Sequence, residues 1–308
     1  MLQKFDPRNK DLKVWVGDQL YSREDAKVSV FDSVVQGGDA VWEGLRVYPE
    51  GIFLLDRHLN RLYESAKALA FVDIPTEESI KSALAQTLEA NNMTRDTHVR
   101  LTLTRGTKIT SGMDPRLNQS GSCLIILAEW KPPVYDNNHG IKVITSTIRR
   151  NNPSFLDSKI HHNNLLNNIQ AKIQANVAGV DAALMLDYFG FAAELNGTNI
   201  FMVKDGAIHT PTAEACLHGI TRGMIIQICQ EQSIEIKERN ISLTELYNAD
   251  QVFCSGTMGE LTPITHIDGR RIENRSDVDL LPELIRHCLL YTSPSPRDLS
   301  TSRMPSSA

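Results

Sequence analysis

The hydrophobic positions of the first third of the chain follow a helical period. Four apolar residues recur at intervals of three or four positions: Leu59, Leu62, Ala66 and Leu69. Side chains at these intervals share one face of a helix, so the segment is expected to bury a single apolar stripe. Asp56 precedes the stripe and is a candidate N-cap, because its carboxylate can accept from the free N–H groups of the first turn. A second helix, with apolar residues at every fourth position, is expected after Pro75.

Short runs of β-branched and aliphatic residues predict strands. The first two runs form a hairpin around Gly17-Asp18, a dipeptide typical of tight turns. A polar loop over 105–121 is long enough to carry function rather than only connect two strands. Two more helices are expected over 161–177 and 220–230. The expected strands cover 14–16, 19–21, 99–104, 123–127, 141–144, 182–186, 199–203 and 252–254.

The pattern divides the chain into two domains. A length of 308 residues suffices for two ordinary domains. The segment Lys131-Pro132-Pro133 follows a strand, and two prolines neither continue a sheet ladder nor start a helix interior. We therefore predict an α+β domain over 1–130, a linker over 131–137 and a larger α/β domain over 138–288.

The last twenty residues differ from the rest. From Leu289 the chain is rich in serine and proline and has no apolar period. This stretch resembles the translation of a sequencing adapter read through at the end of a gene fragment, and a natural disordered tail is the alternative. We expect 289–308 to lie outside the fold and the native C-terminus to be missing.

Composition narrows the class of protein. The formal net charge of −5 and the lack of a basic run argue against a nucleic-acid partner. The five cysteines are scattered singly, without a C-x-x-C pair, so no metal site and no full disulfide framework are expected. No signal peptide and no apolar run long enough to span a bilayer are recognised. The expectation is a soluble cytoplasmic protein that does not bind membranes.

A set of chemically distinct residues in the second half of the chain suggests a cofactor site. Lys159 offers an amine, Glu194 a carboxylate among apolar neighbours, and Gly219-Ile220-Thr221 the start of a helix. Pyridoxal phosphate requires an amine for its aldehyde, an acid for its ring nitrogen and N–H groups for its phosphate. The order and spacing of these three features therefore favour a pyridoxal phosphate site.

Several motifs in the same order strengthen this interpretation. Together they resemble the class IV aminotransferases, which are fold type IV pyridoxal phosphate enzymes, over roughly residues 13 to 270. The family includes branched-chain aminotransferases, D-amino acid transaminases, R-selective amine transaminases and aminodeoxychorismate lyase. The motifs are Val28-Ser29-Val30-Phe31-Asp32, Gly44-Leu45-Arg46-Val47-Tyr48, Asp56-Arg57-His58-Leu59, Thr104-Arg105-Gly106, 194–199, Gly219-Ile220-Thr221-Arg222 and Ser255-Gly256-Thr257.

The resemblance implies a fold and a role for each site residue. The fold is that of D-amino acid aminotransferase, α/β overall, with pyridoxal 5'-phosphate in a cleft between the two domains. Lys159 is then the Schiff-base lysine and the proton-transfer group, while Glu194 pairs with the ring nitrogen and Asn199 braces it. The residues implied to contact the phosphate are Arg57, Ile220, Thr221 and Thr257, and Asn164 stands where branched-chain enzymes place a tyrosine near the phenolic oxygen.

The substrate is implied less completely. Branched-chain enzymes carry a Tyr-x-Arg motif on a strand of the small domain, and here His98-Val99-Arg100 retains only the arginine. D-specific enzymes use an Arg-x-His pair in the following loop, which is missing from 105–116. We expect Arg100, His98, Thr257 and Met258 to contact a hydrophobic, branched L-amino acid, with 2-oxoglutarate as acceptor and a homodimer or higher homo-oligomer as the assembly.

Three other interpretations stay open at this stage. The first is a D-amino acid or R-amine transaminase of the same fold. The second is a pyridoxal phosphate lyase of the aminodeoxychorismate type, which would lack the half-reaction with a keto acid. The third is a binding protein without catalysis. The adjacent His161 and His162 do not share a helix face, so packing and hydrogen bonding are favoured over a metal or catalytic pair.

Overall fold

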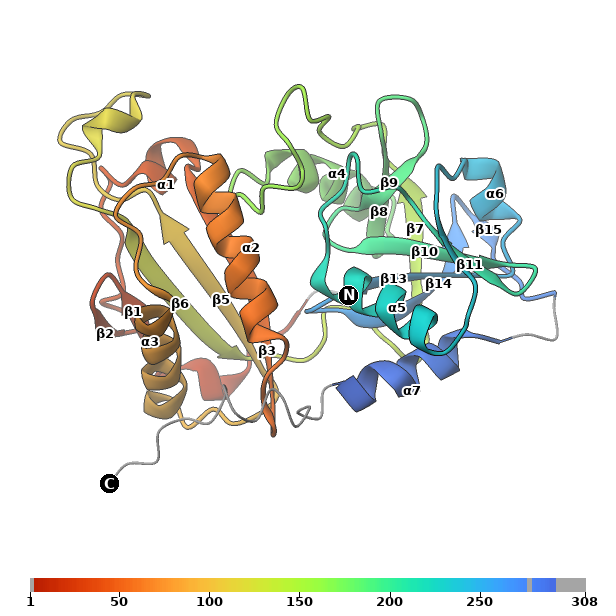
Figure 1. The fold of residues 1–308 in the computed structure, drawn as a ribbon, viewed down its shortest axis with the longest axis horizontal. Helices are drawn as coiled ribbons and strands as arrows, with labels where there is room; N and C mark the ends of the chain where they lie inside the picture. The colour runs from red at the N-terminus through yellow and green to blue at the C-terminus, as the bar shows by residue number, and fades with distance from the viewer. Residues whose placement is uncertain (1–2, 276–278, 292–308) are drawn as a thin grey trace. The chain divides into compact units, whose positions relative to one another are not determined.

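The computed structural model describes residues 3–275 and 279–291. The chain forms two compact units, coloured from red to blue along the sequence in Figure 1. The N-terminal unit comprises residues 3–132 and 160–164. Of the described residues, the C-terminal unit comprises 133–159, 165–275 and 279–291. The chain thus passes from one unit to the other between Pro132 and Pro133, and it returns to the N-terminal unit for five residues that the predicted domain boundaries placed in the second domain.

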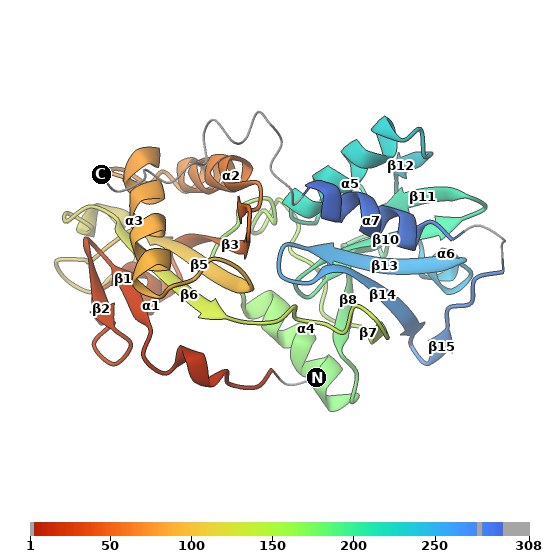
Figure 2. The same cartoon turned by 90° about the horizontal axis from the view of Figure 1, so that it is seen from below.

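The N-terminal unit is an antiparallel sheet with two helices on one face (Figure 2). The strand order is β2-β1-β6-β5-β3-β4. The hairpin expected around Gly17-Asp18 is confirmed, with Val16 opposite Gln19. The elements are η1 (Pro7–Asn9), β1 (Lys13–Val16), β2 (Gln19–Ser22), α1 (Ser33–Gly37), β3 (Ala40–Tyr48), β4 (Gly51–Ile52), α2 (Leu55–Ala68), α3 (Glu77–Ala90), β5 (Thr97–Thr104), η2 (Pro115–Leu117) and β6 (Cys123–Trp130).

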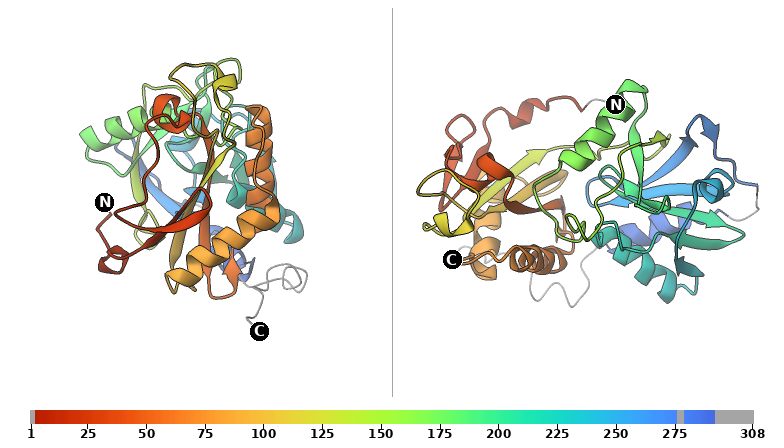
Figure 3. Two further views of the ribbon diagram at one scale, coloured as in Figure 1. Left: turned by 90° about the vertical axis from the view of Figure 1, so that its left-hand side faces the viewer. Right: turned by 90° about the horizontal axis from the view of Figure 1, so that it is seen from above.

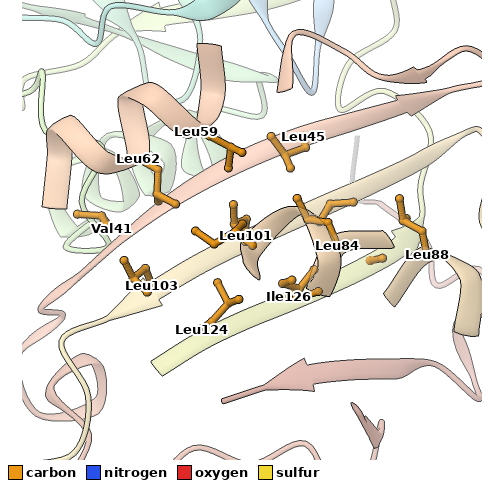
Figure 4. Packing of buried hydrophobic residues seen from close by; sticks show 14 of the residues in the cluster. Val41, Leu45, Leu59, Leu62, Leu84, Leu88, Leu101, Leu103, Leu124 and Ile126 are labelled. Carbon is orange, nitrogen blue, oxygen red and sulfur yellow. The ribbon is translucent and has the colours of Figure 1, made fainter. Parts of the chain in front are cut away.

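The core of this unit lies between the helices and the sheet. Figure 4 shows Leu59 and Leu62 of α2 near Leu45 of β3, and Leu84 of α3 near Leu101 of β5 and Ile126 of β6. The predicted stripe is therefore confirmed for Leu59, Leu62 and Ala66, which are fully buried. Burial of a side chain of this size contributes on the order of 2 kcal/mol, which is why the stripe specifies the packing of α2.

The predicted cap of α2 is wrong. The N-cap is Leu54, whose backbone is left-handed with a φ of 46°, and no side chain caps the helix. Asp56 lies inside the first turn, where its charge still suits the positive end of the helix, and its carboxylate pairs with Lys81 at 2.8 Å. The second helix begins as expected, since Thr76 caps α3 by accepting from Ser79 N.

The C-terminal unit is a mixed sheet flanked by helices. The strand order is β12-β11-β10-β13-β14-β7-β8-β9, with β15 paired to β14. Figure 3 shows α4 on one side of this sheet and α5 with α7 on the other. The elements are β7 (Ile141–Thr145), α4 (Leu166–Val177), β8 (Ala182–Leu186), β9 (Ala192–Leu195), β10 (Asn199–Lys204), β11 (Ala207–Thr210), α5 (Ile220–Glu231), β12 (Ile236–Glu238), α6 (Leu243–Tyr247), β13 (Gln251–Gly256), β14 (Glu260–Ile267), β15 (Arg270–Arg271) and α7 (Leu281–Tyr291).

The helix predicted over 161–177 is too long at its start. The helix α4 begins at Leu166, because the preceding residues use their backbone groups elsewhere. Trp42 N donates to His161 O at 2.9 Å, and Asn163 N donates to Ala40 O at 2.7 Å. These bonds to β3 hold the segment extended and prevent it from closing helical turns.

The predicted tail overlaps the last helix. The helix α7 continues to Tyr291, so the first three residues of the range 289–308 are helical. The remainder, 292–308, lies outside the described residues. Among the described helices, none is both long and apolar enough to cross a bilayer. The cytoplasmic location stays a prediction.

The loop over 105–121 is closed by a glycine contact. Gly106 has a φ of +95°, and a Cβ at this position would lie 1.9 Å from Gly121 O. Its carbonyl accepts from Ser33 N and from the Asn118 amide, so both ends of the loop meet here. A side chain at Gly106 is therefore excluded both by backbone strain and by collision with a carbonyl.

Gly106→Ala is expected to destabilise the N-terminal unit by at least about 2 kcal/mol, the cost of positive φ plus displacement of the loop. Gly17→Ala is the matched control, because Gly17 also has positive φ (+71°) but nothing lies within 4 Å of its Cβ position. It should cost about 1 kcal/mol. Urea unfolding followed by tryptophan fluorescence measures both, since Trp15, Trp42 and Trp130 all belong to this unit. Equal losses in the two variants would contradict the contact.

Candidate functional site

Lys159 lies in a turn at the end of the first segment of the C-terminal unit. Its Nζ lies 3.2 Å from Asp157 Oδ1 and 3.4 Å from the carbonyl oxygen of Glu214, and its side chain is 38% exposed. Burial acts to raise the pKa of Asp157, but the backbone and side-chain hydrogen bonds from Lys159 hold it below its ordinary value. The amine is thus accessible and held between two oxygen acceptors.

Glu194 is a buried carboxylate on β9. Its Oε1 accepts from Arg150 Nε at 2.6 Å, and both side chains are 6% exposed. Its Oε2 accepts from Asn199 Nδ2 at 3.2 Å and from Leu217 N at 3.3 Å. A buried charge is tolerated only with a counter-charge and hydrogen bonds, and Arg150 provides the former. The carboxylate is thereby fixed in position before any ligand arrives.

Asn199 connects this carboxylate to the start of α5. Its Nδ2 donates to Glu194 and also to Leu217 O at 3.0 Å. Its Oδ1 occupies the space beside Gly219, where a Cβ would approach it to 2.0 Å. Only glycine fits at this helix start while the amide keeps its place, so Gly219 and Asn199 are structurally coupled.

The N-terminus of α5 is suited to an anion. Gly219 is the N-cap, and no side chain caps the helix, so its first N–H groups point outward with the positive end of the helix dipole. Two hydroxyl groups add to the suitability of this region for an anion. Thr221 Oγ1 and Ser255 Oγ are buried hydroxyls without a hydrogen-bond partner among the described residues. Buried hydroxyls normally have partners, so these two orphaned groups fit a phosphate group that accepts from them.

Cys216 is a buried thiol in the segment that leads into α5. Burial is the main cause that raises the pKa of its thiol to about 12, and the charge of Glu194 raises it further. Arg222, Arg150 and Lys159 act in the opposite direction. Hydrogen-bond contacts place the amine and the carboxylate beside this segment, because Lys159 Nζ lies 3.4 Å from Glu214 O and Leu217 N donates to Glu194 Oε2 at 3.3 Å.

The remaining predicted residues of the C-terminal unit lie at the end of β13. Thr257 and Met258 are half-buried and follow this strand directly. Met258 O accepts from Val134 N at 3.0 Å, which fixes the turn. Among the residues predicted for this site, the unit brings together Lys159, Glu194, Asn199, Ile220 and Thr221, with Thr257 and Met258 after the strand that pairs with β10.

Arg57 and Asn164 belong to the N-terminal unit. Arg57 is exposed on α2, in the first turn after Leu55. Asn164 is exposed and packs beside Gly38, since a Cβ at Gly38 would lie 3.6 Å from its Cα. Their predicted roles at the phosphate and the phenolic oxygen stay predictions.

Arg100 is a largely buried cation on β5. Its guanidinium lies over the ring of Trp42, 3.8 Å from the centroid, and its Nη2 donates to Asn163 Oδ1. Burial lowers its pKa to about 10, which still leaves it charged at neutral pH. A cation stacked on an aromatic ring keeps a fixed direction, which suits recognition of a carboxylate.

His98 precedes Arg100 by two residues, so both side chains point to the same face of β5. Burial is the main cause that lowers the pKa of His98 to about 3, and Lys131, Arg100 and Arg46 lower it further. Its imidazole is therefore neutral at neutral pH. Its Nε2 is buried without a hydrogen-bond partner among the described residues.

Arg150 is a site residue that the sequence analysis missed. It follows β7 in Ile148-Arg149-Arg150, and its backbone N donates to Leu186 O at 2.8 Å. Two adjacent arginines after a strand are usually exposed, so the pattern gave no reason to select one. Arg150 is buried because it forms an ion pair with Glu194 of β9, a contact that the local sequence does not indicate.

Comparison with known proteins identifies the family to which this geometry corresponds. Residues 40–267 match the family model described as Amino-transferase class IV. Branched-chain-amino-acid aminotransferase-like protein 2 of Arabidopsis thaliana is 59% identical over 266 residues, which cover 86% of this chain and 48% of that protein. The chain thus spans about half the length of this relative.

Two further comparisons cover nearly whole proteins. The branched-chain-amino-acid aminotransferase of Pseudomonas aeruginosa is 34% identical over 274 residues, which cover 86% of this chain and 87% of that protein. The crystal structure of the branched-chain aminotransferase from the thermophilic archaeon Thermoproteus uzoniensis with norvaline is similar, with a TM-score of 0.84 and 29% identity. This similarity covers 94% of this chain and 98% of that chain.

Gly219→Ala is expected to destabilise the C-terminal unit by about 1–3 kcal/mol, because the new methyl group displaces the Asn199 amide from Glu194. Gly223→Ala is the control on the same helix, where nothing lies within 4 Å of the added Cβ. It should be neutral or stabilising by up to about 1 kcal/mol, since alanine favours helix. Urea unfolding followed by far-UV circular dichroism gives both values. Indistinguishable unfolding of the two variants would refute the coupling.

Proposed function

Because the chain belongs to the class IV aminotransferase family, we propose that it is a pyridoxal phosphate-dependent transaminase. The observation that carries the proposal is the arrangement around the segment 214–217. Lys159 Nζ lies 3.4 Å from the Glu214 carbonyl, and Glu194 accepts from Leu217 N at 3.3 Å. An amine, a buried carboxylate and an uncapped helix start thus converge on one short stretch of chain.

The residues present fit the cofactor. Lys159 would hold the aldehyde, Glu194 the ring nitrogen, and the first N–H groups of α5 with the hydroxyls of Thr221 and Ser255 the phosphate. When bound, the cofactor supplies an electron sink for the carbanion left by removal of the α-proton. Arg57, Thr257 and Asn164 are proposed as further ligands from the family resemblance.

The protein's own groups have distinct tasks in this reaction. Arg150 and Asn199 keep Glu194 in one orientation, which preorganises a negative charge before the ring arrives. Lys159 Nζ would accept the proton from the α-carbon of the substrate, and Asp157 Oδ1, at 3.2 Å, would stabilise the resulting ammonium group. The donor amino acid would leave as its keto acid, and a second keto acid, which we propose to be 2-oxoglutarate, would receive the amino group and leave as an amino acid.

The proposed donor is a hydrophobic, branched L-amino acid. The relatives and the solved structure carry branched-chain names, and Arg100 offers a fixed, largely buried cation for an α-carboxylate. His98 lies on the same face of β5 and is neutral, and its Nε2 has no hydrogen-bond partner among the described residues. This nitrogen is proposed to form a hydrogen bond with the substrate. A homodimer is expected from the family resemblance.

Borohydride reduction of the protein purified with pyridoxal phosphate is expected to fix the cofactor on Lys159. The reason is that Lys159 Nζ lies 3.4 Å from the Glu214 carbonyl, in the segment that also contacts Glu194, whereas Lys172 lies inside α4 and donates to Asp181 O. Peptide mass mapping identifies the labelled lysine, and Lys159→Met should carry no label. Labelling of Lys142 or Lys172 in place of Lys159, or no labelling at all, would show that the proposed function is wrong.

Arg100→Met is expected to lower kcat/KM for L-leucine by about 30-fold or more, since a charge-assisted contact contributes about 2 kcal/mol or more. Simple amines without a carboxylate should be affected less than about threefold (about 0.6 kcal/mol). Arg95→Met is the control, because Arg95 is 68% exposed in the turn before β5. Steady-state rates with L-leucine, D-alanine and R-1-phenylethylamine decide the donor class. A preference of the unaltered enzyme for either of the last two overturns the L-amino acid assignment.

A further inference from the structure

A second buried carboxylate lies in the N-terminal unit, on β3. Glu43 is fully buried. Arg61 donates to it through Nε at 2.8 Å and Nη2 at 2.6 Å. Two imidazoles complete the cluster: His58 Nδ1 lies 2.6 Å from Oε2, and His161 Nδ1 lies 3.2 Å from Oε1. One carboxylate therefore joins β3, the helix α2 and the short segment 160–164.

The protonation of this cluster follows from burial. Burial alone would raise the pKa of Glu43, but His161, Arg61 and His58 hold it well below its usual range. Burial lowers the pKa of His161 to about 4 and also lowers that of His58. At neutral pH the cluster is one ion pair with two neutral imidazoles. Because an ionised carboxylate only accepts, we assign the proton of each imidazole to Nδ1, from which it is donated to Glu43. Arg61 Nη2 also lies 3.4 Å from His161 Nδ1.

The segment that carries His161 is bound to the N-terminal unit along its whole length. Trp42 N donates to His161 O at 2.9 Å, and His161 N donates to Ser65 Oγ at 3.0 Å. The rings of Trp42 and His161 pack with centroids 4.2 Å apart. Ile160 packs against the hydrophobic core of this unit. The residues after Lys159 thus have little freedom, and the His161 side chain tethers them to a fully buried carboxylate.

The segment 160–164 begins directly after Lys159. Lys159 ends a segment of the C-terminal unit, and Ile160 begins the segment that belongs to the N-terminal unit. A lysine side chain has several rotatable bonds, so its reach is defined only if its backbone is held. On the N-terminal side, Asp157 accepts from Lys159 N at 3.0 Å. On the C-terminal side, a side-chain tether follows two residues later, where His161 donates to Glu43.

We propose that Glu43 is a positioning residue, and that its hydrogen bond with His161 fixes the backbone from which the Lys159 amine reaches its partners. The inference rests on the proposed function, in which Lys159 holds the cofactor aldehyde and moves the α-proton. Misplacement of a reacting group by about 1 Å can cost about a hundredfold in rate. Loss of the tether therefore lowers the rate at which Lys159 reacts, and it leaves substrate binding largely unchanged.

His58 offers a matched control within the same cluster. Its Nδ1 also donates to Glu43, it is fully buried, and it lies inside α2. His58→Phe and His161→Phe each remove one donor from the same carboxylate, so both should lower the unfolding temperature. Of the two histidines, only His161 is close to Lys159 in the chain. A purely structural role for the cluster predicts equal consequences, whereas a positioning role predicts different ones.

The test compares three variants of the full chain: His161→Phe, His161→Asn and His58→Phe. The phenylalanine at 161 keeps a ring against Trp42 but loses the donor, and the asparagine keeps an N–H donor close to the Nδ1 position. Thermal unfolding of the cofactor-free proteins establishes folding. Three measurements follow. Absorbance gives the rate of pyridoxal phosphate uptake, peptide mass mapping gives the rate of Lys159 acetylation in the cofactor-free protein, and steady-state kinetics give kcat and KM.

His161→Phe is expected to slow cofactor uptake and lower kcat by about tenfold to a hundredfold, with KM changed less than about threefold. It should also change the acetylation rate of Lys159 without cofactor. His161→Asn should restore the rate of cofactor uptake and kcat to within about threefold of the unaltered protein. His58→Phe should keep kcat within about twofold of the unaltered value despite its lower unfolding temperature. This pattern supports the proposal.

Two results overturn the inference. One is a His161→Phe variant that takes up cofactor and turns over at the unaltered rate. The other is an equal loss of kcat in the two phenylalanine variants, which would mean that the cluster acts only through stability. Failure of the proposed function gives a separate signal, because the unaltered chain would then take up no cofactor on Lys159 in the borohydride experiment.

Discussion

The ion pair between Arg150 and Glu194 is the interaction on which the candidate site depends. Arg150 follows β7, Glu194 lies on β9, and the other oxygen of the carboxylate reaches Asn199 on β10 and Leu217 before α5. One buried charge therefore ties together four segments of the chain. Removal of a single partner leaves a charge in an apolar surrounding, which is far more costly than loss of an exposed pair.

Each unit contains a buried ion pair between a glutamate and an arginine, but the other donors around the two carboxylates differ. Each buries one glutamate against an arginine, Glu194 with Arg150 and Glu43 with Arg61. Around Glu194 the other donors described above are an amide side chain and a backbone N–H, which do not titrate. Around Glu43 they are imidazoles, which take up protons in acid.

The parts of the structure that depend on local pattern were predictable. The stripe of α2, the hairpin at Gly17 and the start of α5 follow from spacing and turn chemistry, and the structure has them as expected. The start of α4 was missed because the backbone of 161–163 pairs with β3, a partner more than a hundred residues away. The cap of α2 was missed because Leu54 adopts a left-handed backbone that no pattern indicates.

Part of the candidate site was also predictable from local sequence. The types and spacing of Lys159, Glu194 and Gly219-Ile220-Thr221 indicate their chemistry, and the structure brings them around one segment. Arg150 and Glu43 were not selected, because an arginine beside another arginine and a glutamate within a strand are ordinary until their burial is known. Contacts across the sheet, and not local sequence, assign them their partners.

The close approach of Asn199 Oδ1 to Gly219 has a consequence for inheritance. A side chain at 219 requires a shorter residue at 199, and a shorter residue at 199 removes the brace of Glu194. A change at either position alone therefore costs stability, and we expect substitutions at 199 and 219 to occur together in evolution although twenty positions separate them in the chain.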